Sequence, residues 1–148
     1  DDLPILVLPG ITALLAASAR LGAPIGHDFC VINLSDNLKS WDILKSRVIA
    51  AAKADFVIAF YNPRSKSRKN QLSEIYDVLR KNCKSDRIVI YANSISTESE
   101  AVFETTLSEA DASSVSMKTL VIIGSSSTKK IRNTGYIYTP RYSGVEKN

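Results

Sequence analysis

A cluster of basic residues follows a buried apolar run near the middle of the chain. Residues 56–60 (Phe-Val-Ile-Ala-Phe) are typical of a buried strand, which Asn62-Pro63 ends. Four cations then occur within six residues: Arg64, Lys66, Arg68 and Lys69. Ligands of α/β folds bind at the carboxyl ends of strands, and guanidinium and ammonium groups bind carboxylates and phosphates. The sequence therefore predicts an anion site here, and a solvated charged surface explains the same cluster equally well.

Small polar residues also follow two other apolar runs. Ser35 and Asp36 come after the run 29–32, and Gly-Ser-Ser-Ser-Thr occupies 124–128 after the run 119–123. If all three strands run parallel, their ends meet at one edge of a sheet and form a polar rim. Asn, Asp, Ser and Gly are also the ordinary residues of turns, so each of these loops taken alone is more typical of a turn than of a site.

Apolar runs of strand length alternate with segments of helical spacing along the chain. The runs are 5–8, 29–32, 56–60, 87–91, 119–123 and 135–139. This alternation predicts an α/β fold, and strands made almost wholly of Val, Ile and Phe are expected to be covered on both faces. We therefore predict a three-layer α/β/α sandwich with a mixed sheet. The 148 residues are enough for one domain with a core of its own.

Four segments place apolar residues on one face of a helix. The predicted faces are Leu14, Leu15, Ser18 and Leu21; Trp41, Leu44 and Val48; Leu72, Ile75, Tyr76 and Leu79; and Phe103, Leu107 and Ala110. Thr12 is placed to cap the first helix, and Gly22 is placed to end it. Thr97 and Glu100 have the spacing of a capping box and predict the start of the last helix.

Composition argues against several classes of site. A net charge of +4 is below that of a dedicated nucleic-acid-binding domain. The single His27 and the distant Cys30 and Cys83 lack the spacing of a zinc site, so no metal is expected. We expect reduced thiols, with a disulfide as the open alternative. No apolar run is long enough to span a membrane and no secretory signal opens the chain, which favours a cytoplasmic protein without membrane partners. From the residues alone, the chain is an α/β domain with an anion-binding edge.

The chain also carries a series of short motifs whose order and spacing are specific. They are Pro-Gly-Ile-Thr-Ala at 9–13, Gly-Ala-Pro at 22–24, Gly-His-Asp-Phe at 26–29, Leu-Ser-Asp at 34–36, Phe-Tyr-Asn-Pro-Arg-Ser-Lys-Ser-Arg at 60–68, Gly-Ser-Ser-Ser-Thr at 124–128 and Tyr-Thr-Pro-Arg at 138–141. Together they resemble the tetrapyrrole methylases, the S-adenosylmethionine-dependent enzymes of corrin and sirohaem synthesis. Within that family they are most similar to the branch of cobalamin biosynthesis that methylates C17 of precorrin-3B.

The resemblance implies an enzyme of two α/β domains that binds S-adenosylmethionine and a precorrin in the cleft between them, usually as a homodimer. The first domain of such enzymes has a glycine-rich GxGPG-type loop and a GDP-type loop, and neither occurs here. Residues 1–26 are therefore expected to be the last strand and helix of the donor-binding domain plus a linker, and residues 27–148 the C-terminal methylase domain. On this expectation the chain alone is inactive. The alternative is a catalytically inactive anion-binding or dimerisation module derived from this family.

The resemblance and the predicted edge together suggest which residues contact the two ligands. Those expected to contact S-adenosylmethionine are Thr12, Ala13, Asn62, Ser94 and Ile95. Those expected to bind the carboxylates of the precorrin are Ser35, Asp36, Arg64, Lys66 and Arg68. No catalytic residue is predicted, because methyl transfer from a sulfonium to a ring carbon is an in-line displacement that depends on positioning more than on acid–base groups.

Overall fold

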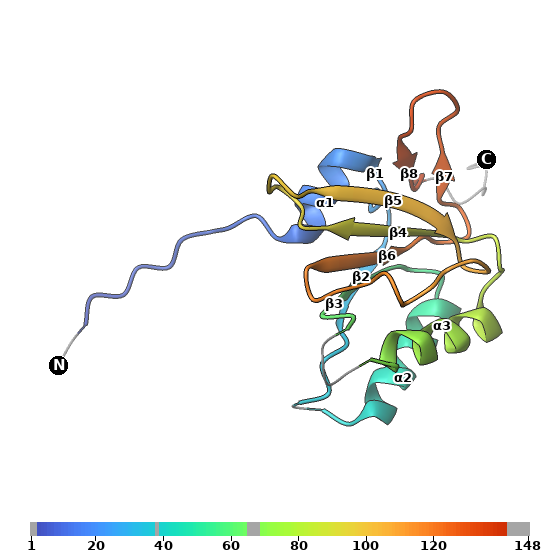
Figure 1. The fold of residues 1–148 in the computed structure, drawn as a ribbon, viewed down its shortest axis with the longest axis horizontal. Coiled ribbons are helices and arrows are strands. Elements are labelled where there is room, and N and C mark those ends of the chain that lie inside the picture. Colours follow the sequence, from blue (N-terminus) through green and yellow to red (C-terminus); the bar gives the residue numbers. More distant parts are fainter. Residues whose placement is uncertain (1–2, 38, 65–68, 142–148) are drawn as a thin grey trace, which may run out of the picture.

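The computed structural model describes residues 3–37, 39–64 and 69–141. A five-stranded sheet forms the centre, with strand order β2-β3-β6-β4-β5 (Figure 1). These strands are β2 (Phe29–Asn33), β3 (Val57–Tyr61), β4 (Ile88–Asn93), β5 (Ala101–Thr106) and β6 (Thr119–Ile123). β2 and β3 are parallel, whereas β6 runs antiparallel to both of its neighbours and β5 runs antiparallel to β4. The mixed sheet predicted from the sequence is confirmed.

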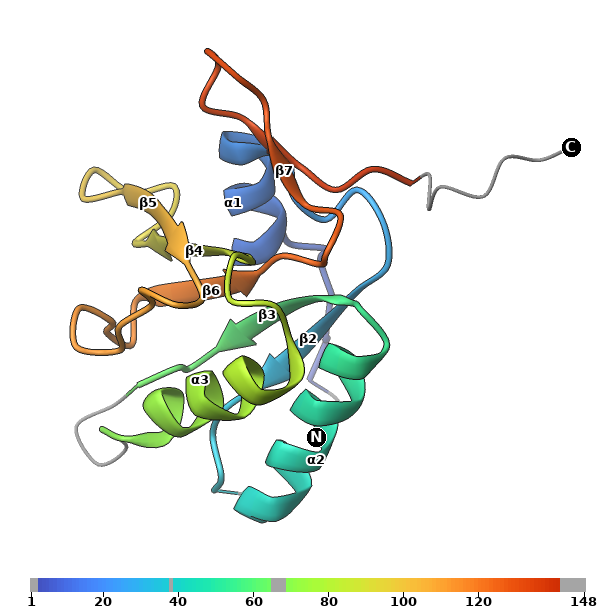
Figure 2. The same cartoon turned by 90° about the vertical axis from the view of Figure 1, so that its right-hand side faces the viewer.

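Helices cover both faces of this sheet. They are α1 (Ala13–Leu21), α2 (Trp41–Lys53) and α3 (Gln71–Asn82). α1 lies on one face, and α2 and α3 lie side by side on the other (Figure 2). Buried residues accordingly form two clusters, one on each face, because alternate side chains of a strand point to opposite sides. The predicted three-layer α/β/α arrangement is confirmed.

The helical faces follow the predicted spacing in α2 and α3 and depart from it in α1. The buried residues of α2 and α3 include Leu44, Val48, Leu72, Ile75, Tyr76 and Leu79. In α1, Leu15 is exposed and Ala17 is buried in its place, so this part of the prediction was wrong. Ala17 belongs to the same buried cluster as Ala59 of β3 and Ala92 of β4. Small side chains therefore meet where α1 crosses the sheet.

A buried pair of phenols links α3 to the sheet. Tyr76 Oη donates to Tyr91 Oη over 2.9 Å, and Tyr91 Oη donates to the Asp111 carbonyl oxygen over 3.1 Å. Burial raises the pKa of both phenols above the ordinary tyrosine value, because the charged form is disfavoured there. The pair therefore stays neutral and connects α3, β4 and the loop after β5.

The segment predicted as a fourth helix is a turn followed by a strand, so that prediction was wrong. Residues 94–99 form turns and bends, and β5 starts soon after them. Glu100 reaches back as in a capping box, but its Oε2 accepts the Ser96 N–H over 2.7 Å and closes a turn. Phe103 stacks on Tyr91 of β4 with ring centroids 4.6 Å apart. Cross-strand pairing of this kind stabilises a strand here, although the spacing of the apolar residues is that of a helix.

Residues 3–12 form neither a helix nor a strand and extend away from the rest of the molecule (Figure 1). The strand predicted at 5–8 is therefore not formed. Its apolar side chains are exposed, as are those of Leu3 and Ile11. A strand needs a neighbour for its backbone N–H and C=O groups, and no strand in the described part of the chain pairs with this segment.

Three two-residue strands form a small second sheet that follows the end of α1. They are β1 (Gly22–Ala23), β7 (Lys129–Lys130) and β8 (Ile137–Tyr138), in the order β1-β8-β7. Gly22 ends α1 as predicted, with a left-handed φ of +109°. A Cβ at this position would lie 3.0 Å from the Ile137 carbonyl oxygen. Only Ile137 and Tyr138 of the strand predicted at 135–139 are in strand conformation.

The loop 124–128 lies at the edge of the large sheet opposite to the ends of β2 and β3, because β6 is antiparallel to β3. The prediction that three polar strand ends meet at one edge is therefore wrong for this loop. Its hydroxyls make a tight turn instead. Thr128 Oγ1 accepts the Ser125 N–H over 2.8 Å and lies 2.8 Å from Thr139 Oγ1. This loop connects β6 to the small sheet and holds the two together.

Candidate functional site

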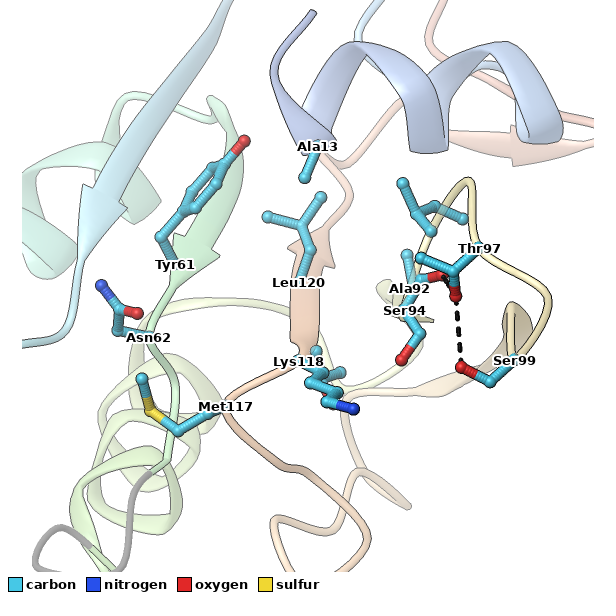
Figure 3. Close-up of a pocket in the computed structure, with 12 residues that line it drawn as sticks. Ala13, Tyr61, Asn62, Ala92, Ser94, Thr97, Ser99, Met117, Lys118 and Leu120 are labelled. Carbon is cyan, nitrogen blue, oxygen red and sulfur yellow. Dashed lines mark hydrogen bonds between the residues drawn. The ribbon is translucent and has the colours of Figure 1, made fainter.

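A cavity of about 510 Å³ opens at the sheet edge where β3 and β4 end and β6 begins (Figure 3). Its lining residues come from separate segments of the chain and are Ala13, Tyr61, Asn62, Ala92, Ser94, Ile95, Thr97, Ser99, Met117, Lys118, Thr119 and Leu120. Ala13, Asn62, Ser94 and Ile95 are all predicted donor contacts. The structure therefore brings four of the five predicted donor-site positions to one cavity.

The antiparallel pairing of β4 and β6 builds the floor of the cavity. Ala92 of β4 pairs with Leu120 of β6, and Asn93 pairs with Thr119. β3 also pairs antiparallel to β6 and therefore runs in the same direction as β4. For this reason Asn62, which follows β3, comes to the same edge as the segment that follows β4.

Backbone in the left-handed region shapes the walls of the cavity. Asn62 has φ +50° and Ser94 has φ +48°, and Ser96, between the lining residues Ile95 and Thr97, has φ +63°. Residues other than glycine rarely adopt this conformation, and it concentrates at functional sites. The Ser94 N–H donates to the Lys118 carbonyl oxygen over 2.9 Å, which ties the turn after β4 to the loop before β6.

The cavity has an apolar floor and a polar corner. Ala13, Ala92 and Leu120 contribute apolar side chains to the lining, whereas Ser94, Ser99 and Lys118 contribute polar ones (Figure 3). Among the residues that the structure describes, none forms an ion pair with Lys118. An apolar floor suits a flat ring, and an ammonium among the lining groups suits a carboxylate.

Thr12, the fifth predicted donor-site residue, lies just outside the cavity lining and contacts it through Tyr61. The Thr12 Oγ1 and Tyr61 Oη atoms are hydrogen-bonded, and Tyr61 Oη also accepts the Leu14 N–H over 2.9 Å. Thr12 is the N-cap residue of α1, as predicted, although its side chain makes no capping bond within the helix. The start of α1 is therefore held by a residue of β3.

Ser35 and Asp36 lie at the same sheet edge but outside the cavity lining. Asn33 Oδ1 accepts the Ser35 N–H over 2.9 Å and Asn62 Nδ2 over 3.1 Å, which joins the ends of β2 and β3. Asp36 Oδ2 accepts from Gln71 Nε2 over 2.8 Å at the start of α3. The parallel strands β2 and β3 thus form a polar edge, as predicted for these two strand ends.

Arg64, predicted as a carboxylate-binding cation, contacts backbone. Its Nη1 donates to the carbonyl oxygens of Ala112 over 2.9 Å and Ser113 over 2.6 Å. Arg64 thereby anchors the loop after β5 to the end of β3. Lys66 and Arg68, the other predicted cations, lie outside the described residues.

Two findings concern metal binding and membrane-spanning helices. In the described part of the chain, no group of three or more His, Cys, Asp or Glu side chains is arranged to hold a metal ion. None of its helices has the length and apolar character needed to cross a membrane.

The sequence profile of the tetrapyrrole (corrin/porphyrin) methylases matches residues 1–111. The chain belongs to this family. A precorrin-3B C(17)-methyltransferase of Sinorhizobium sp. is 45% identical over 147 residues, which cover 97% of this chain and 58% of that protein. A probable cobalt-factor III C(17)-methyltransferase of Salmonella typhimurium is 41% identical, over 95% of this chain and 57% of its own length. The tetrapyrrole methylase chain described here therefore spans less than two thirds of the length of these relatives.

A solved structure of the methyltransferase CobJ has the same fold as this tetrapyrrole methylase chain. The two superpose with a TM-score of 0.87 at 46% identity, over 90% of this chain and 55% of CobJ. A cobalt precorrin-4 methyltransferase, CbiF, superposes with a TM-score of 0.56 at 16% identity, over 79% of this chain and 50% of CbiF, and this likeness concerns the fold alone.

Sequence reasoning missed several residues that line the cavity of this tetrapyrrole methylase chain. Tyr61 has a place in a motif but no predicted role, and no motif includes Met117, Lys118 or Thr119. The last three reach the cavity because β6 is antiparallel and therefore begins, rather than ends, at this edge. No local signal in the sequence gives this direction, because the strand that precedes β6 in the chain is β5, which is not its partner in the sheet.

Proposed function

We propose that the natural protein containing this chain is an S-adenosylmethionine-dependent C-methyltransferase of cobalamin biosynthesis. Its substrate would be precorrin-3B or the cobalt form, methylated at C17 with ring contraction. One observation carries the proposal: Ala13, Asn62, Ser94 and Ile95 come from three separate segments and line a single cavity at the ligand-binding edge of the sheet. The functions of the relatives, a precorrin-3B and a probable cobalt-factor III C(17)-methyltransferase, support the same reaction class.

The cavity fits the methyl donor in size and in chemistry. Its volume of about 510 Å³ is within the range of cofactor sites. The floor of Ala92 and Leu120 suits the adenine ring, the hydroxyls of Ser94 and Thr97 suit the ribose, and the Lys118 ammonium suits the carboxylate of the methionyl part.

The role of this chain in the reaction is to position the ligands. When bound, S-adenosylmethionine supplies an electrophilic methyl group on its sulfonium. Asn62 and Ser94, whose backbone is in the left-handed region, hold one side of the cavity, and Ala92 and Leu120 give it an apolar floor. In-line displacement gains most of its rate from such positioning, and no acid–base residue is assigned.

We propose that the precorrin lies beside this cavity, over the ends of β2 and β3. Ser35 and Asp36 would face it from β2, and the cations of the loop after β3, Lys66 and Arg68 with Arg64, would bind its carboxylates. Arg64 has a second task, since its Nη1 is bonded to two carbonyl oxygens. Lys66 and Arg68 are therefore the better targets for testing carboxylate recognition.

The remaining assignments belong to the same proposal. Residues 1–26 would complete the donor-binding domain and lead into residues 27–148, which form the second domain. The protein would act as a cytoplasmic homodimer without nucleic-acid or membrane partners. The division into domains rests on the family and on the length of the relatives, and the homodimer is what the family resemblance implies.

Calorimetric titration of the natural protein with S-adenosylmethionine tests the proposal. We expect saturable binding, and we expect Ala13→Trp to weaken it by about tenfold or more, which is about 1.4 kcal/mol, because the indole would fill the cavity. Ala50→Trp, on the exposed side of α2 and across the sheet from the cavity, is the matched control and should bind as the wild type does.

The competing function is a non-catalytic anion-binding or dimerisation module. It predicts no heat of binding with S-adenosylmethionine for the natural protein, and no effect of Ala13→Trp on any ligand. The first of these outcomes would exclude the methyltransferase. The anchoring of Arg64 to backbone speaks against a loop that serves only to bind anions.

A further inference from the structure

We propose that Tyr61 is a positioning residue whose hydroxyl fixes the start of α1 against the cavity. The inference rests on the proposed function and adds a residue to which no role has been assigned. Tyr61 has its ring in the cavity wall, and its hydroxyl points toward the start of α1 (Figure 3). It would act on the methyl donor through Thr12 and Ala13.

The hydrogen bonds of Tyr61 take the place of an ordinary helix cap. The first N–H groups of a helix have no partner inside the helix and are usually satisfied by the N-cap side chain. In α1 the Thr12 side chain makes no such bond. Tyr61 Oη instead accepts the Leu14 N–H over 2.9 Å and is hydrogen-bonded to Thr12 Oγ1. One hydroxyl thus satisfies a helix N–H and orients the N-cap residue.

Tyr61 can reach α1 because of its register in β3. Val57 and Ala59 belong to the buried cluster beneath α1, and Tyr61 packs against the same cluster two residues further on. The small Ala59 and the edge position of Tyr61 leave the ring partly exposed to the cavity. The Tyr61 hydroxyl thus contacts Leu14, which lies 47 positions earlier in the chain, and Thr12, which lies 49 positions earlier.

The position of Ala13 depends on this contact. Ala13 is the first residue of α1 and lies between Thr12 and Leu14, which both bond to the Tyr61 hydroxyl. The segment before Thr12 is exposed and forms no secondary structure in the described residues. Removal of the hydroxyl would therefore free the first turn of α1 and displace the Ala13 side of the cavity.

A double-mutant cycle in the natural protein tests this role. Tyr61→Phe removes only the hydroxyl, and Thr12→Val keeps the branched shape of threonine without its hydroxyl. We expect each variant to raise the Kd for S-adenosylmethionine about tenfold, which corresponds to about 1.4 kcal/mol. The double variant should be no weaker than Tyr61→Phe alone, because Tyr61→Phe already removes the bond to Thr12 together with the bond to the Leu14 N–H. Thr12→Ser should restore binding.

Tyr136→Phe is the matched control, since Tyr136 is exposed in the loop between β7 and β8. It should leave the Kd unchanged. Hydrogen exchange of the Leu14 amide gives a second readout that needs no ligand, and Tyr61→Phe should speed this exchange while amides of α2 keep their rates.

The outcomes separate this inference from the proposed function. Wild-type Kd in Tyr61→Phe would overturn the positioning role even if thermal stability fell, because a purely structural tyrosine changes stability alone. Additive effects of Tyr61→Phe and Thr12→Val, or unchanged exchange at Leu14, would also overturn it. A wild-type protein that binds no S-adenosylmethionine would overturn the proposed function and this inference with it.

Discussion

Arg64 belongs to the basic loop, yet its contacts give it a structural role. Its guanidinium lies between the end of β3 and the loop after β5, and Nη1 bonds to the carbonyl oxygens of Ala112 and Ser113. The same loop holds Asp111, whose pKa is lowered by hydrogen bonds from Ser113 and by nearby Arg64. A positive charge at this point therefore stabilises one defined loop conformation.

We predict that Arg64→Gln destabilises the protein by about 1–3 kcal/mol, since hydrogen bonds that involve a charged group contribute about that much. Urea unfolding of the natural protein measures the change. Arg47→Gln is the matched control, because Arg47 is exposed on α2, and it should cost less than about 0.5 kcal/mol. Equal effects of the two substitutions would show that the Arg64 contacts contribute nothing to stability.

At the level of single residues, the sequence could indicate cavity positions that a motif or the family resemblance marks, but not those that depend on strand direction. Asn62 lies in a motif and Ser94 is suggested by the resemblance, and both line the cavity. Lys118 and Met117 could not be placed there, because no motif marks them and their location depends on the direction of β6. The hydroxyl contact of Tyr61 with α1 was equally hidden, since it joins segments far apart in the sequence.

At the scale of elements, β6 decides which loops share an edge. It enters the sheet between β3 and β4 and is antiparallel to both. Consequently the loop before β6 borders the cavity, and the loop 124–128 after it lies at the other edge and makes a tight hydroxyl-bonded turn. Apolar content alone predicted the limits of this strand but contained no information on its direction.

The tight turn after β6 leads to a prediction at Gly124. A Cβ there would lie 2.8–2.9 Å from three side-chain atoms of Thr128, so Gly124→Ala must displace a threonine that bonds to Ser125 and Thr139. We expect a loss of about 1–3 kcal/mol, typical of overpacking, measured by thermal or urea unfolding.

Gly10→Ala provides the control for this prediction. Nothing lies within 4 Å of a Cβ at Gly10, and its segment is exposed, so the same chemical change should leave stability within about 0.5 kcal/mol of the wild type. A Gly124→Ala variant as stable as Gly10→Ala would mean that the turn can open without cost. Binding of S-adenosylmethionine should be unaffected by Gly124→Ala, because the 124–128 loop is on the far edge.

At the scale of the whole molecule, the layers were predictable and the helix-to-strand ratio was not. Continuous apolar runs predicted four of the central strands, and spacing identified α2 and α3. The segment 97–110 has helical spacing as well, but the stacking of Phe103 on Tyr91 gives it a partner in the sheet. Local patterns cannot include such a partner, which exists only when the sheet has formed.

The charge distribution of the molecule leads to a last prediction. The chain carries a net charge of +4, and four of its cations follow β3 in the sequence. β3 ends at the same edge as the cavity. A polycarboxylate substrate would be attracted by this charge, whereas the cavity floor is apolar. Because salt screens exposed charges, we expect raising the salt from about 50 to about 500 mM to weaken precorrin binding by about tenfold and S-adenosylmethionine binding by less than about threefold.

Arg68→Glu makes the prediction specific to the loop. The reversed charge should weaken precorrin binding at low salt and flatten its salt dependence, with the affinity for S-adenosylmethionine unchanged. Arg132→Glu is the matched control, because it alters the net charge equally at an exposed position between β7 and β8. If both variants flatten the salt dependence alike, the attraction comes from the net charge and the loop after β3 is not the carboxylate site.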